Sequence, residues 1–252
     1  YYQTLAKTQK LQKEVLLQSI KAQESEEMKA SFIKSICHEI RTPLNSINGF
    51  SEILSNDIST PEEQEDYQAI ILENTRLLTS LLGSLVEVAN LDSLTENFTL
   101  TPIEIGSYCR AEMQYLKEAG GKQEIDYQLD LPENDYKVYS HPQYFSLLLR
   151  ALLNNANKFT TQGFINLSCR KDNKRKMLLV SITDTGCGIP AEKHEYVFRR
   201  FTKLDIFKQG SGLGLYLCKL IIKHMQGDIY IDETYTKGSR FIFTLPMEET
   251  KK

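Results

Sequence analysis

Residues 31–44 read Ser-Phe-Ile-Lys-Ser-Ile-Cys-His-Glu-Ile-Arg-Thr-Pro-Leu and carry one histidine, His38, next to an acid. Apolar residues recur at three- and four-residue spacings over residues 32–54, which predicts an amphipathic helix with one apolar face. Thr42 lies on the same helix face as the histidine, and Pro43 removes a backbone donor, so we expect a bend there. A histidine beside a carboxylate on a stiff helix suits a nucleophile. It is equally typical of an ordinary surface histidine, and this stretch alone does not decide between the two.

The helical pattern extends from this stretch toward the N-terminus. Residues 3 to about 54 contain hardly any helix breaker. The part up to about residue 29 is polar with sparse apolar positions, which suits a two-stranded coiled coil better than a globular core.

A second helix follows a short turn at residues 56–62. Ser59 or Thr60 can cap this helix, which we expect from about residue 62 to about residue 94. Two long amphipathic helices joined by a short turn predict an antiparallel hairpin. A lone hairpin cannot cover both apolar stripes, so we expect two hairpins to form a homodimeric four-helix bundle. Asn74 lies in the second stripe and either fixes the register or faces solvent.

The pattern changes after about residue 97, where short strands alternate with helices. Such a change after an all-helical half predicts a separate α/β domain. Strands are expected at residues 98–101, 125–129, 164–170, 177–183, 227–233 and 240–245. Helices are expected at residues 105–119, 142–156 and 213–224.

Length, charge and cysteine content narrow the class of protein. The 252 residues suit two domains, and a net charge of -3 without Lys/Arg blocks gives no footprint for nucleic acid. The five cysteines are scattered and never in C-x-x-C spacing, which argues against a disulfide framework or a zinc site and favours a reducing cytosol. No stretch approaches the roughly 20 apolar residues that span a bilayer. The chain begins without methionine on a helical run, so we expect an upstream part to precede it.

Three features of the second half suit a nucleotide phosphate site. One helix ends with Asn155 and Lys158, whose amide oxygen and ammonium group can meet Mg²⁺ and phosphate. One strand ends in Asp184 and two glycines, where a carboxylate can accept a hydrogen bond from an exocyclic amine such as that of adenine. Alternate glycines at residues 210–214 precede a helix, and backbone N–H groups there can approach a polyphosphate. Each feature alone also fits an ordinary cap, turn or loop, but the three together favour a nucleotide site.

At this point the chain resembles the sensor histidine kinases. The resemblance rests on five sequence boxes in the family's order. They are the H box at residues 38–44, the N box at 155–160, the G1 box at 184–188, the F box at 197–203 and the G2 box at 210–215. It covers about residues 31–247, and the short lid before the last box looks like that of Bacteroidetes kinases in particular.

The resemblance implies a multidomain fold. An N-terminal coiled-coil signalling helix is expected at residues 1–30, a dimerisation and histidine phosphotransfer domain at 31–96, and a catalytic ATP-binding domain at 97–252. The second is an all-α helical hairpin that forms a dimeric four-helix bundle. The third is an α/β sandwich of the Bergerat (GHKL) ATPase fold, a mixed sheet with helices on one face.

The resemblance also implies roles for single residues. His38 would be phosphorylated, Glu39 would accept its ring N–H, and Thr42 would orient a water that dephosphorylates the regulator. Asn155 would bind Mg²⁺, and Asp184 would read the adenine amine. The remaining ATP-binding residues would be Lys158, Gly186, Gly188, Lys203, Gly210, Gly212 and Gly214, with Phe198 and Phe201 anchoring the lid.

Some positions depart from the family's pattern. Ala151 replaces a second Asn one turn before the metal ligand, His141 and Tyr144 replace an Asp and an Arg at the start of that helix, and Lys203 replaces the usual lid Arg. Lysine keeps the charge but loses the bidentate fork of arginine. A slow kinase would be consistent with these changes.

The expected activity is ATP-dependent, Mg²⁺-assisted autophosphorylation of His38, followed by transfer to an aspartate of a response regulator receiver domain, with phosphatase activity as an addition. The expected partners are a second copy of the chain, that regulator and an upstream sensor domain. The expected location is the cytoplasmic portion of an inner-membrane-anchored sensor. Two alternatives remain: an adaptor that binds a regulator with little kinase activity, and an ATPase of the gyrase or Hsp90 type, against which the H box speaks.

Overall fold

The computed structural model describes most of the chain. The described residues are 2–56, 60–93, 98–132, 136–172, 174–205 and 210–247. The chain divides into two compact units, Tyr1–Thr79 and Ser80–Lys252. The domain boundaries expected near residues 30 and 96 stay predictions.

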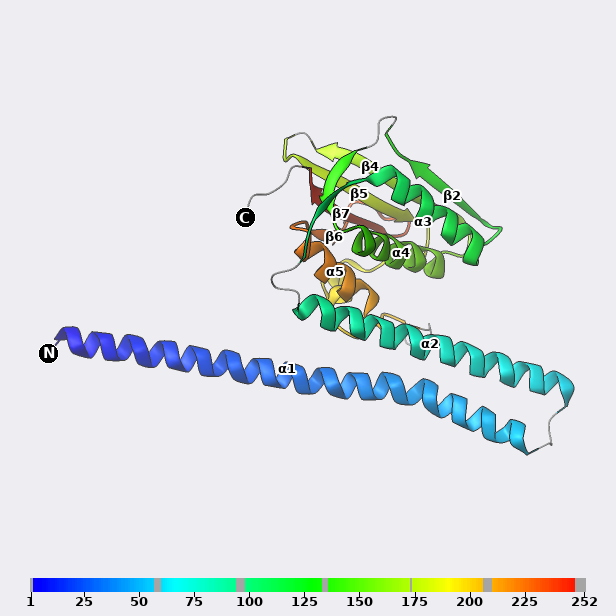
Figure 1. The fold of residues 1–252 in the computed structure, drawn as a ribbon, viewed down its shortest axis with the longest axis horizontal. Helices are drawn as coiled ribbons and strands as arrows, with labels where there is room; N and C mark the ends of the chain where they lie inside the picture. Colours follow the sequence, from blue (N-terminus) through cyan, green and yellow to red (C-terminus); the bar gives the residue numbers. More distant parts are fainter. Residues whose placement is uncertain are drawn as a thin grey trace. The chain divides into compact units, whose positions relative to one another are not determined.

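Two long helices dominate the N-terminal part of the chain, as predicted (Figure 1). Helix α1 spans Tyr2–Ser55 and continues through Pro43, and helix α2 spans Pro61–Ser93. The rings of Phe50 and Tyr67 lie 5.2 Å apart between centroids, so the chain folds back on itself as a hairpin.

A capping box fixes the start of α2. The backbone N–H of Thr60 donates to Glu63 Oε2 at 2.8 Å, and the N–H of Glu63 donates to Thr60 Oγ1 at 3.3 Å. These bonds satisfy backbone donors that a helix start leaves without partners. The hydrogen bonds from Thr60 lower the pKa of the Glu63 carboxyl. Thr60 is therefore the cap, and Ser59, the other candidate, lies outside the described residues.

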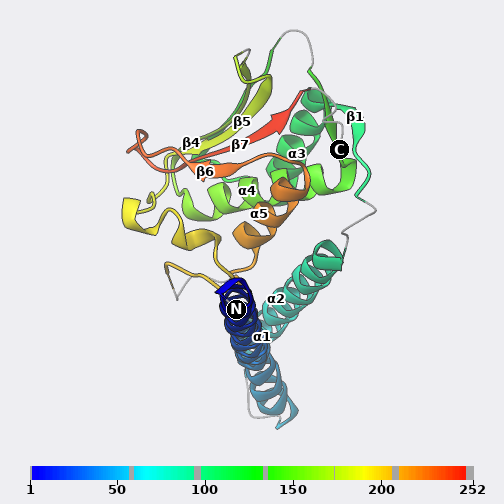
Figure 2. The ribbon, with the colours of Figure 1, turned by 90° about the vertical axis from the view of Figure 1, so that its left-hand side faces the viewer.

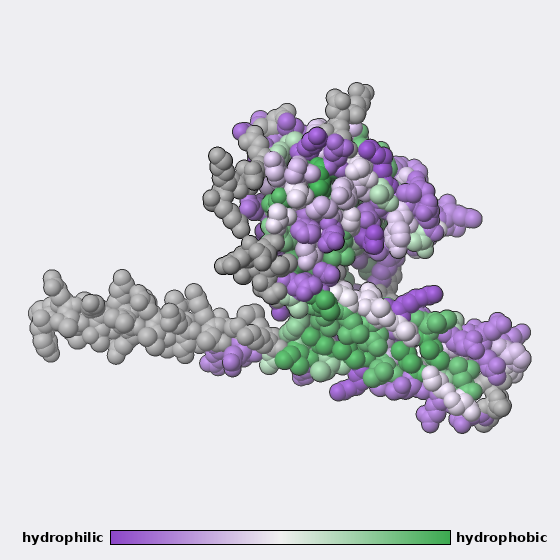
Figure 3. Space-filling view, in the orientation of Figure 1, coloured by the Kyte–Doolittle hydropathy of each residue, from purple (hydrophilic) through white to green (hydrophobic). Residues whose placement is uncertain are grey.

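The hairpin leaves its apolar side chains uncovered. Ile33, Leu44, Ile53 and Leu72 are 41–60% exposed. No large apolar side chain that the structure describes between residues 30 and 79 is fully buried. Figure 3 shows a green, apolar patch over the described part of α1 and α2. Asn74 lies in the stripe half-buried, and its amide donates to the carbonyl of Ile70 at 2.8 Å, so it bonds its own helix.

Helix α2 departs from one expectation. The segment Pro61–Leu91 reaches a mean hydropathy of 1.3, so by length and composition alone it could cross a membrane, although no such stretch was predicted. The reason is the run of residues 77–86, which contains no charged side chain. This run is half the roughly 20 residues that a span requires, and charged residues flank it on both sides. We attribute the hydropathy to the apolar stripe of a helix bundle.

The second unit is built on a mixed five-stranded sheet in the order β2-β4-β5-β7-β6. Strands β2 and β4 pair in parallel, and the other neighbours are antiparallel. The sheet strands are β2 Ile125–Asp130, β4 Gly163–Asp172, β5 Met177–Asp184, β6 Ile229–Ile231 and β7 Arg240–Pro246. Strands β1 (Thr101–Glu104) and β3 (Lys137–Ser140) form a separate antiparallel pair.

Three helices cover one face of this sheet, as Figures 1 and 2 show. They are α3 Ile105–Gly120, α4 Pro142–Phe159 and α5 Gly214–His224. Alternate residues of β5, including Val180 and Ile182, are fully buried against helix residues such as Phe145. Val88 of α2 is 2% exposed and joins this core, so the last turns of α2 belong to the second unit. The predicted arrangement of a mixed sheet with helices on one face is confirmed.

Several element boundaries differ from prediction. Strand β1 starts at Thr101 instead of residue 98, and β3 was not predicted because only Val138 in it is both apolar and buried. Strand β1 holds Pro102, which a strand with a single paired neighbour tolerates. Helix α4 continues to Phe159, three residues past the predicted end. Two single-turn 3₁₀ helices, Ala191–Lys193 and Tyr196–Phe198, also escaped the sequence pattern.

Candidate nucleotide site and phosphoacceptor histidine

His38 lies on α1 with an exposed side chain. Glu39 beside it is half-buried, and Thr42 is exposed. The hydroxyl of Thr42 donates to the backbone carbonyl of His38 at 3.3 Å. An exposed imidazole on a long helix can be reached by a phosphoryl donor.

Asp184 ends strand β5 and is 3% exposed. Its Oδ1 accepts hydrogen bonds from the backbone N–H of Gly186 at 2.8 Å and of Ser239 at 3.2 Å. Burial raises the pKa of this carboxyl, and the two backbone hydrogen bonds act in the opposite direction. Both bonds fall on one oxygen, so Oδ2 is the oxygen that can accept from a ligand amine. A buried carboxylate held in this way can accept a hydrogen bond from one N–H donor of a ligand.

The glycine after Asp184 allows two box segments to meet. A Cβ at Gly186 would lie 2.6 Å from the carbonyl oxygen of Phe159, the last residue of α4. Only glycine therefore permits the G1 loop to pass the end of the N box. Gly188, two residues on, has a φ of +70°.

The end of α4 faces the G2 loop. A Cβ at Gly210 would lie 3.1 Å from Lys158 Nζ, so the lysine points toward that loop. Asn155 is half-buried one turn before Lys158, on the same helix face. The structure thus brings together the N, G1 and G2 boxes, which lie up to about fifty residues apart in the sequence.

The F box packs beside the same site. Phe198 is 5% exposed and meets the ring of Phe241 edge-on at 6.3 Å. Gly212 has a φ of +68°, and a Cβ there would lie 2.7 Å from the backbone of Phe201. Lys203, two residues after Phe201, has a half-buried side chain. Phe198 thus packs against the sheet, and the backbone of Phe201 passes close to the G2 loop at Gly212. The anchoring of the lid by the two phenylalanines stays a prediction.

Gly214, one of the predicted glycines, is the first residue of α5. A Cβ there would meet no atom within 4 Å in the described part of the chain, so no steric reason for a glycine is seen there. Its small size matters only if a ligand approaches the start of this helix.

The donor groups near the end of α4 fit a metal held mainly by phosphates. Among the described residues, no group of three or more His, Cys, Asp or Glu side chains lies together. Asn155 offers one amide oxygen there. Mg²⁺ commonly takes one or two protein oxygens and completes its shell with waters and substrate phosphates. The residues present therefore fit Mg²⁺ bound with ATP and do not form a protein-only metal cage.

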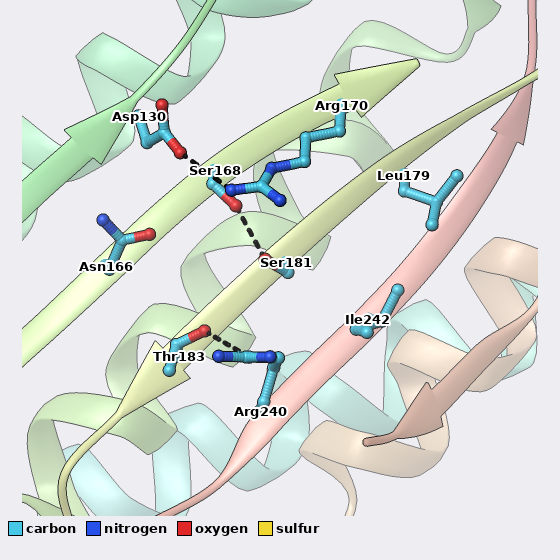
Figure 4. Close-up of a pocket in the computed structure, with 9 residues that line it drawn as sticks. All are labelled: Asp130, Asn166, Ser168, Arg170, Leu179, Ser181, Thr183, Arg240 and Ile242. Atoms are coloured by element: carbon cyan, nitrogen blue, oxygen red, sulfur yellow. Dashed lines mark hydrogen bonds and ion pairs between the residues drawn. The ribbon is translucent and has the colours of Figure 1, made fainter. Parts of the chain in front are cut away.

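A different depression, of about 280 Å³, lies on the face of the sheet opposite the helices (Figure 4). The hydroxyls of Ser168 and Ser181 hydrogen-bond at 2.8 Å in its floor. Arg240 donates to Thr183 Oγ1 at 3.1 Å, and Arg170 lies 3.5 Å from an oxygen of Asp130. Thr183 and Asp184 are consecutive in a strand, so their side chains lie on opposite faces. This depression is separate from the nucleotide site.

Sequence reasoning missed two groups that support the site. Ser239, in the approach to β7, donates to Asp184 from 55 residues away. Lys122 and Tyr127 bond the end of α4 from the loop and strand that follow α3. Neither group lies in a family box, and pairings over such distances leave no local pattern.

Comparison with known proteins identifies both halves of the chain. Residues 28–94 match the His Kinase A (phospho-acceptor) domain, and residues 141–249 match the histidine kinase-, DNA gyrase B- and HSP90-like ATPase domain.

Two sensor proteins are similar to most of the chain. EvgS of Escherichia coli K12 is 30% identical over 98% of the chain, and SrrB of Staphylococcus aureus NCTC 8325 is 33% identical over 89%. The chain spans 21% of the length of EvgS and 39% of that of SrrB.

Two solved structures have a similar fold. Histidine kinase ThkA, in complex with the response regulator protein TrrA, gives a TM-score of 0.70 at 25% identity, covering 88% of this chain and 61% of that one. Acinetobacter baumannii histidine kinase AdeS gives a TM-score of 0.69 at 20% identity, covering 84% and 98%. With a phospho-acceptor domain followed by an ATPase domain, the chain is homologous to the sensor histidine kinases and belongs to that family.

Proposed function

We propose that this chain transfers the γ-phosphoryl group of ATP to His38 and then passes it to an aspartate of a response regulator receiver domain. The observation that carries the proposal is the meeting of three boxes, at Asp184, Lys158 and Gly210, in a chain that also exposes a histidine in a phospho-acceptor domain.

Each residue of the ATP site has a distinct task in this proposal. Asp184 accepts a hydrogen bond from the adenine amine, and Asn155 contributes an oxygen to Mg²⁺. Lys158 and Lys203 offset phosphate charge, while the glycines at 186, 188, 210, 212 and 214 let the backbone approach the nucleotide. The metal, when bound, neutralises charge on the phosphates during transfer.

The acceptor chemistry takes place at the imidazole. One ring nitrogen of His38 forms a bond to the γ-phosphorus as the bond to the bridging oxygen of ADP breaks. Glu39 accepts the N–H of the other ring nitrogen and so favours the reactive tautomer. Thr42 orients a water when the phosphorylated regulator is hydrolysed. The phosphoramidate is labile, which suits onward transfer to a carboxylate.

The apolar stripe of the hairpin supports a homodimer. We propose that α1 and α2 of two chains form a four-helix bundle, because Leu72 and its neighbours are otherwise left in water. The proposed organisation is a signalling helix at residues 1–30, the dimerisation and phosphotransfer domain at 31–96 and the catalytic domain at 97–252. We further propose that an upstream sensor domain controls the chain, which works as the cytoplasmic portion of a membrane-anchored sensor.

Labelled ATP tests the proposal. Incubation with Mg²⁺ and γ-labelled ATP should give an acid-labile, base-stable label on the chain. His38→Gln should abolish the label and leave ATP binding intact, whereas His224→Gln, outside all five boxes, should retain it. Absence of label in the unaltered chain would overturn the kinase proposal in favour of an adaptor. Persistence of label in His38→Gln would show that another residue is the acceptor.

A further inference from the structure

A network of hydrogen bonds outside the five boxes holds the end of helix α4. The ammonium group of Lys122 donates to the backbone carbonyl of Asn157 at 2.5 Å and to that of Thr160 at 2.7 Å. These carbonyls lie at the C-terminal end of α4 and just past it, where backbone acceptors lose their helical partners. A cation at this end also interacts favourably with the helix dipole. Lys122 therefore satisfies two acceptors with one half-buried charge.

The same loop holds the side chain of Asn157 by a second route. The hydroxyl of Tyr127 donates to Asn157 Oδ1 at 2.7 Å and accepts from the backbone N–H of Lys122 at 2.9 Å. The amide of Asn157 donates to the carbonyl of Gly120 at 2.9 Å. Asn157 is thus bonded through its carbonyl, its amide oxygen and its amide nitrogen to residues 120–127.

The loop itself is fixed by a close backbone approach. A Cβ at Gly121 would lie 2.5 Å from the carbonyl oxygen of Lys117, and the N–H of Gly121 donates to that oxygen at 3.1 Å. The backbone therefore follows a fixed path from the end of α3 to Lys122. Residues 117–127 form a rigid support for the last turn of α4.

The Asn157 side chain, which this support holds, lies on the opposite side of α4 from Asn155 and about 100° around the helix from Lys158. Successive helical residues turn by about 100°, so the Asn157 side chain lies roughly 200° around the helix from Asn155. Asn155 and Lys158 are three residues apart and share a face. The network can therefore fix the rotation and height of the last turn without touching ATP or metal.

We propose that Lys122 is a positioning residue for the metal and phosphate end of the ATP site, acting through Asn157 and Thr160, with Tyr127 as a second support. This inference rests on the proposed function, because it assigns the metal and phosphates to Asn155 and Lys158. A single protein ligand for the metal leaves its geometry dependent on how firmly α4 is held. Adenine recognition at Asp184 is held separately, by Gly186 and Ser239.

The test is calorimetric titration of the full chain with ATP, with and without Mg²⁺. Lys122→Met should reduce the gain in ATP affinity that Mg²⁺ provides by about threefold to tenfold, no more than the loss of a direct partner of a metal ligand, because Lys122 acts through the backbone of the helix that carries Asn155. Affinity for metal-free ATP should stay within about twofold, because Asp184 is held by other bonds. Lys122→Arg keeps a cationic donor at this place and should restore most of the Mg²⁺ effect.

Two further variants keep the result interpretable. Tyr127→Phe removes one hydroxyl and should reduce the Mg²⁺ effect by about threefold, which covers the case in which Lys122→Met does not fold. Lys171→Met, an exposed lysine on β4, is the matched control and should behave as the unaltered chain.

Each outcome decides the inference. An unchanged Mg²⁺ effect in Lys122→Met, or in Tyr127→Phe if the former does not fold, would overturn it. Equal losses of affinity with and without Mg²⁺ would also overturn it, because they indicate general loosening of the domain. The titration does not require phosphoryl transfer. A chain that never labels His38 but shows the selective Mg²⁺ loss would refute the proposed function and support the positioning role.

Discussion

The hairpin and the α/β domain differ in how far a single chain buries their apolar side chains. In the hairpin, Ile33 is 60% exposed and Leu72 is 57% exposed. In the α/β domain, Phe145 and Phe243 are completely buried between helices and sheet. One chain therefore suffices to build the core of the domain, whereas the hairpin of a single chain leaves its stripe in water.

The same difference distinguishes the two sites of the proposed reaction, the phosphoryl donor site and the acceptor histidine. The phosphoryl donor site lies on a domain whose packing is complete in one chain. The acceptor, His38, lies on a hairpin that we expect to gain its packing from a second copy. The stability of the acceptor module should therefore depend on chain concentration, and that of the donor module should not.

The largest effect should come from charging the hairpin stripe. Ile33→Glu combined with Leu72→Glu should convert the dimer to monomer at micromolar concentration, because carboxylates would be buried in the bundle core. ATP binding should be retained, since the α/β domain has its own core. Sedimentation measures the oligomeric state, and calorimetry measures ATP binding. Ser80→Glu adds a charge at an exposed position of the same helix, about 80° around the helix from Leu72, and should leave the dimer intact. A double variant that stays dimeric would mean that these side chains lie outside the interface.

A second prediction concerns a substitution in the core of the α/β domain. Phe145→Ala should lower the free energy of unfolding of the α/β domain by about 3–5 kcal/mol, the usual cost of truncating a buried phenylalanine. Dimerisation through the hairpin should survive. Urea unfolding followed by nucleotide binding and by sedimentation measures both. Tyr230→Phe, at a tyrosine that is 40% exposed on β6, should change stability by less than about 0.5 kcal/mol. Loss of the dimer in Phe145→Ala would show that the two modules fold as one unit.

The buried carboxylate of the donor site should give nucleotide binding a pH dependence. In the proposed site, the ionised carboxylate of Asp184 is a stronger acceptor for the adenine amine than the neutral acid, and burial raises the pKa of this carboxyl. As the pH falls, ATP affinity should therefore begin to decline at a higher pH than for an ordinary aspartate, by at most about tenfold per pH unit below that pKa. Titration of ATP at decreasing pH measures this decline. Asp184→Asn should bind weakly at all pH values without that slope. A slope that persists in Asp184→Asn would assign it to another group.

The parts of the fold that were predictable are those with a local period. The long stripes of α1 and α2 and the alternation in β4, β5 and β7 led to elements close to those observed. Strand β3 was missed because only Val138 in its four residues is both apolar and buried. Strand β1 was predicted three residues too early, because Pro102 weakens the strand pattern after Thr101.

The candidate site was predictable only in part. The boxes name the residues that we propose contact the nucleotide, and the structure brings together the segments that hold Asp184 and Lys158. Lys122 and Tyr127 support Asn157 from about 30–35 residues away, through bonds that depend on the folded path of the chain. No spacing rule links such residues, so only the structure reveals them.

The smallest predicted effect tests whether the hairpin has any stability of its own. Thr60→Ala removes the cap of α2 and should cost about 1 kcal/mol. Because the cap lies at the turn, the loss should appear as a lower melting temperature of the helical signal, with unchanged unfolding of the α/β domain. Thr75→Ala is the control, since the Thr75 hydroxyl bonds only the Ile71 carbonyl of its own helix in the contacts described. If both variants melt at the same temperature as the unaltered chain, the cap at the turn does not stabilise the hairpin. The stability of the hairpin would then come from the proposed dimer contacts alone.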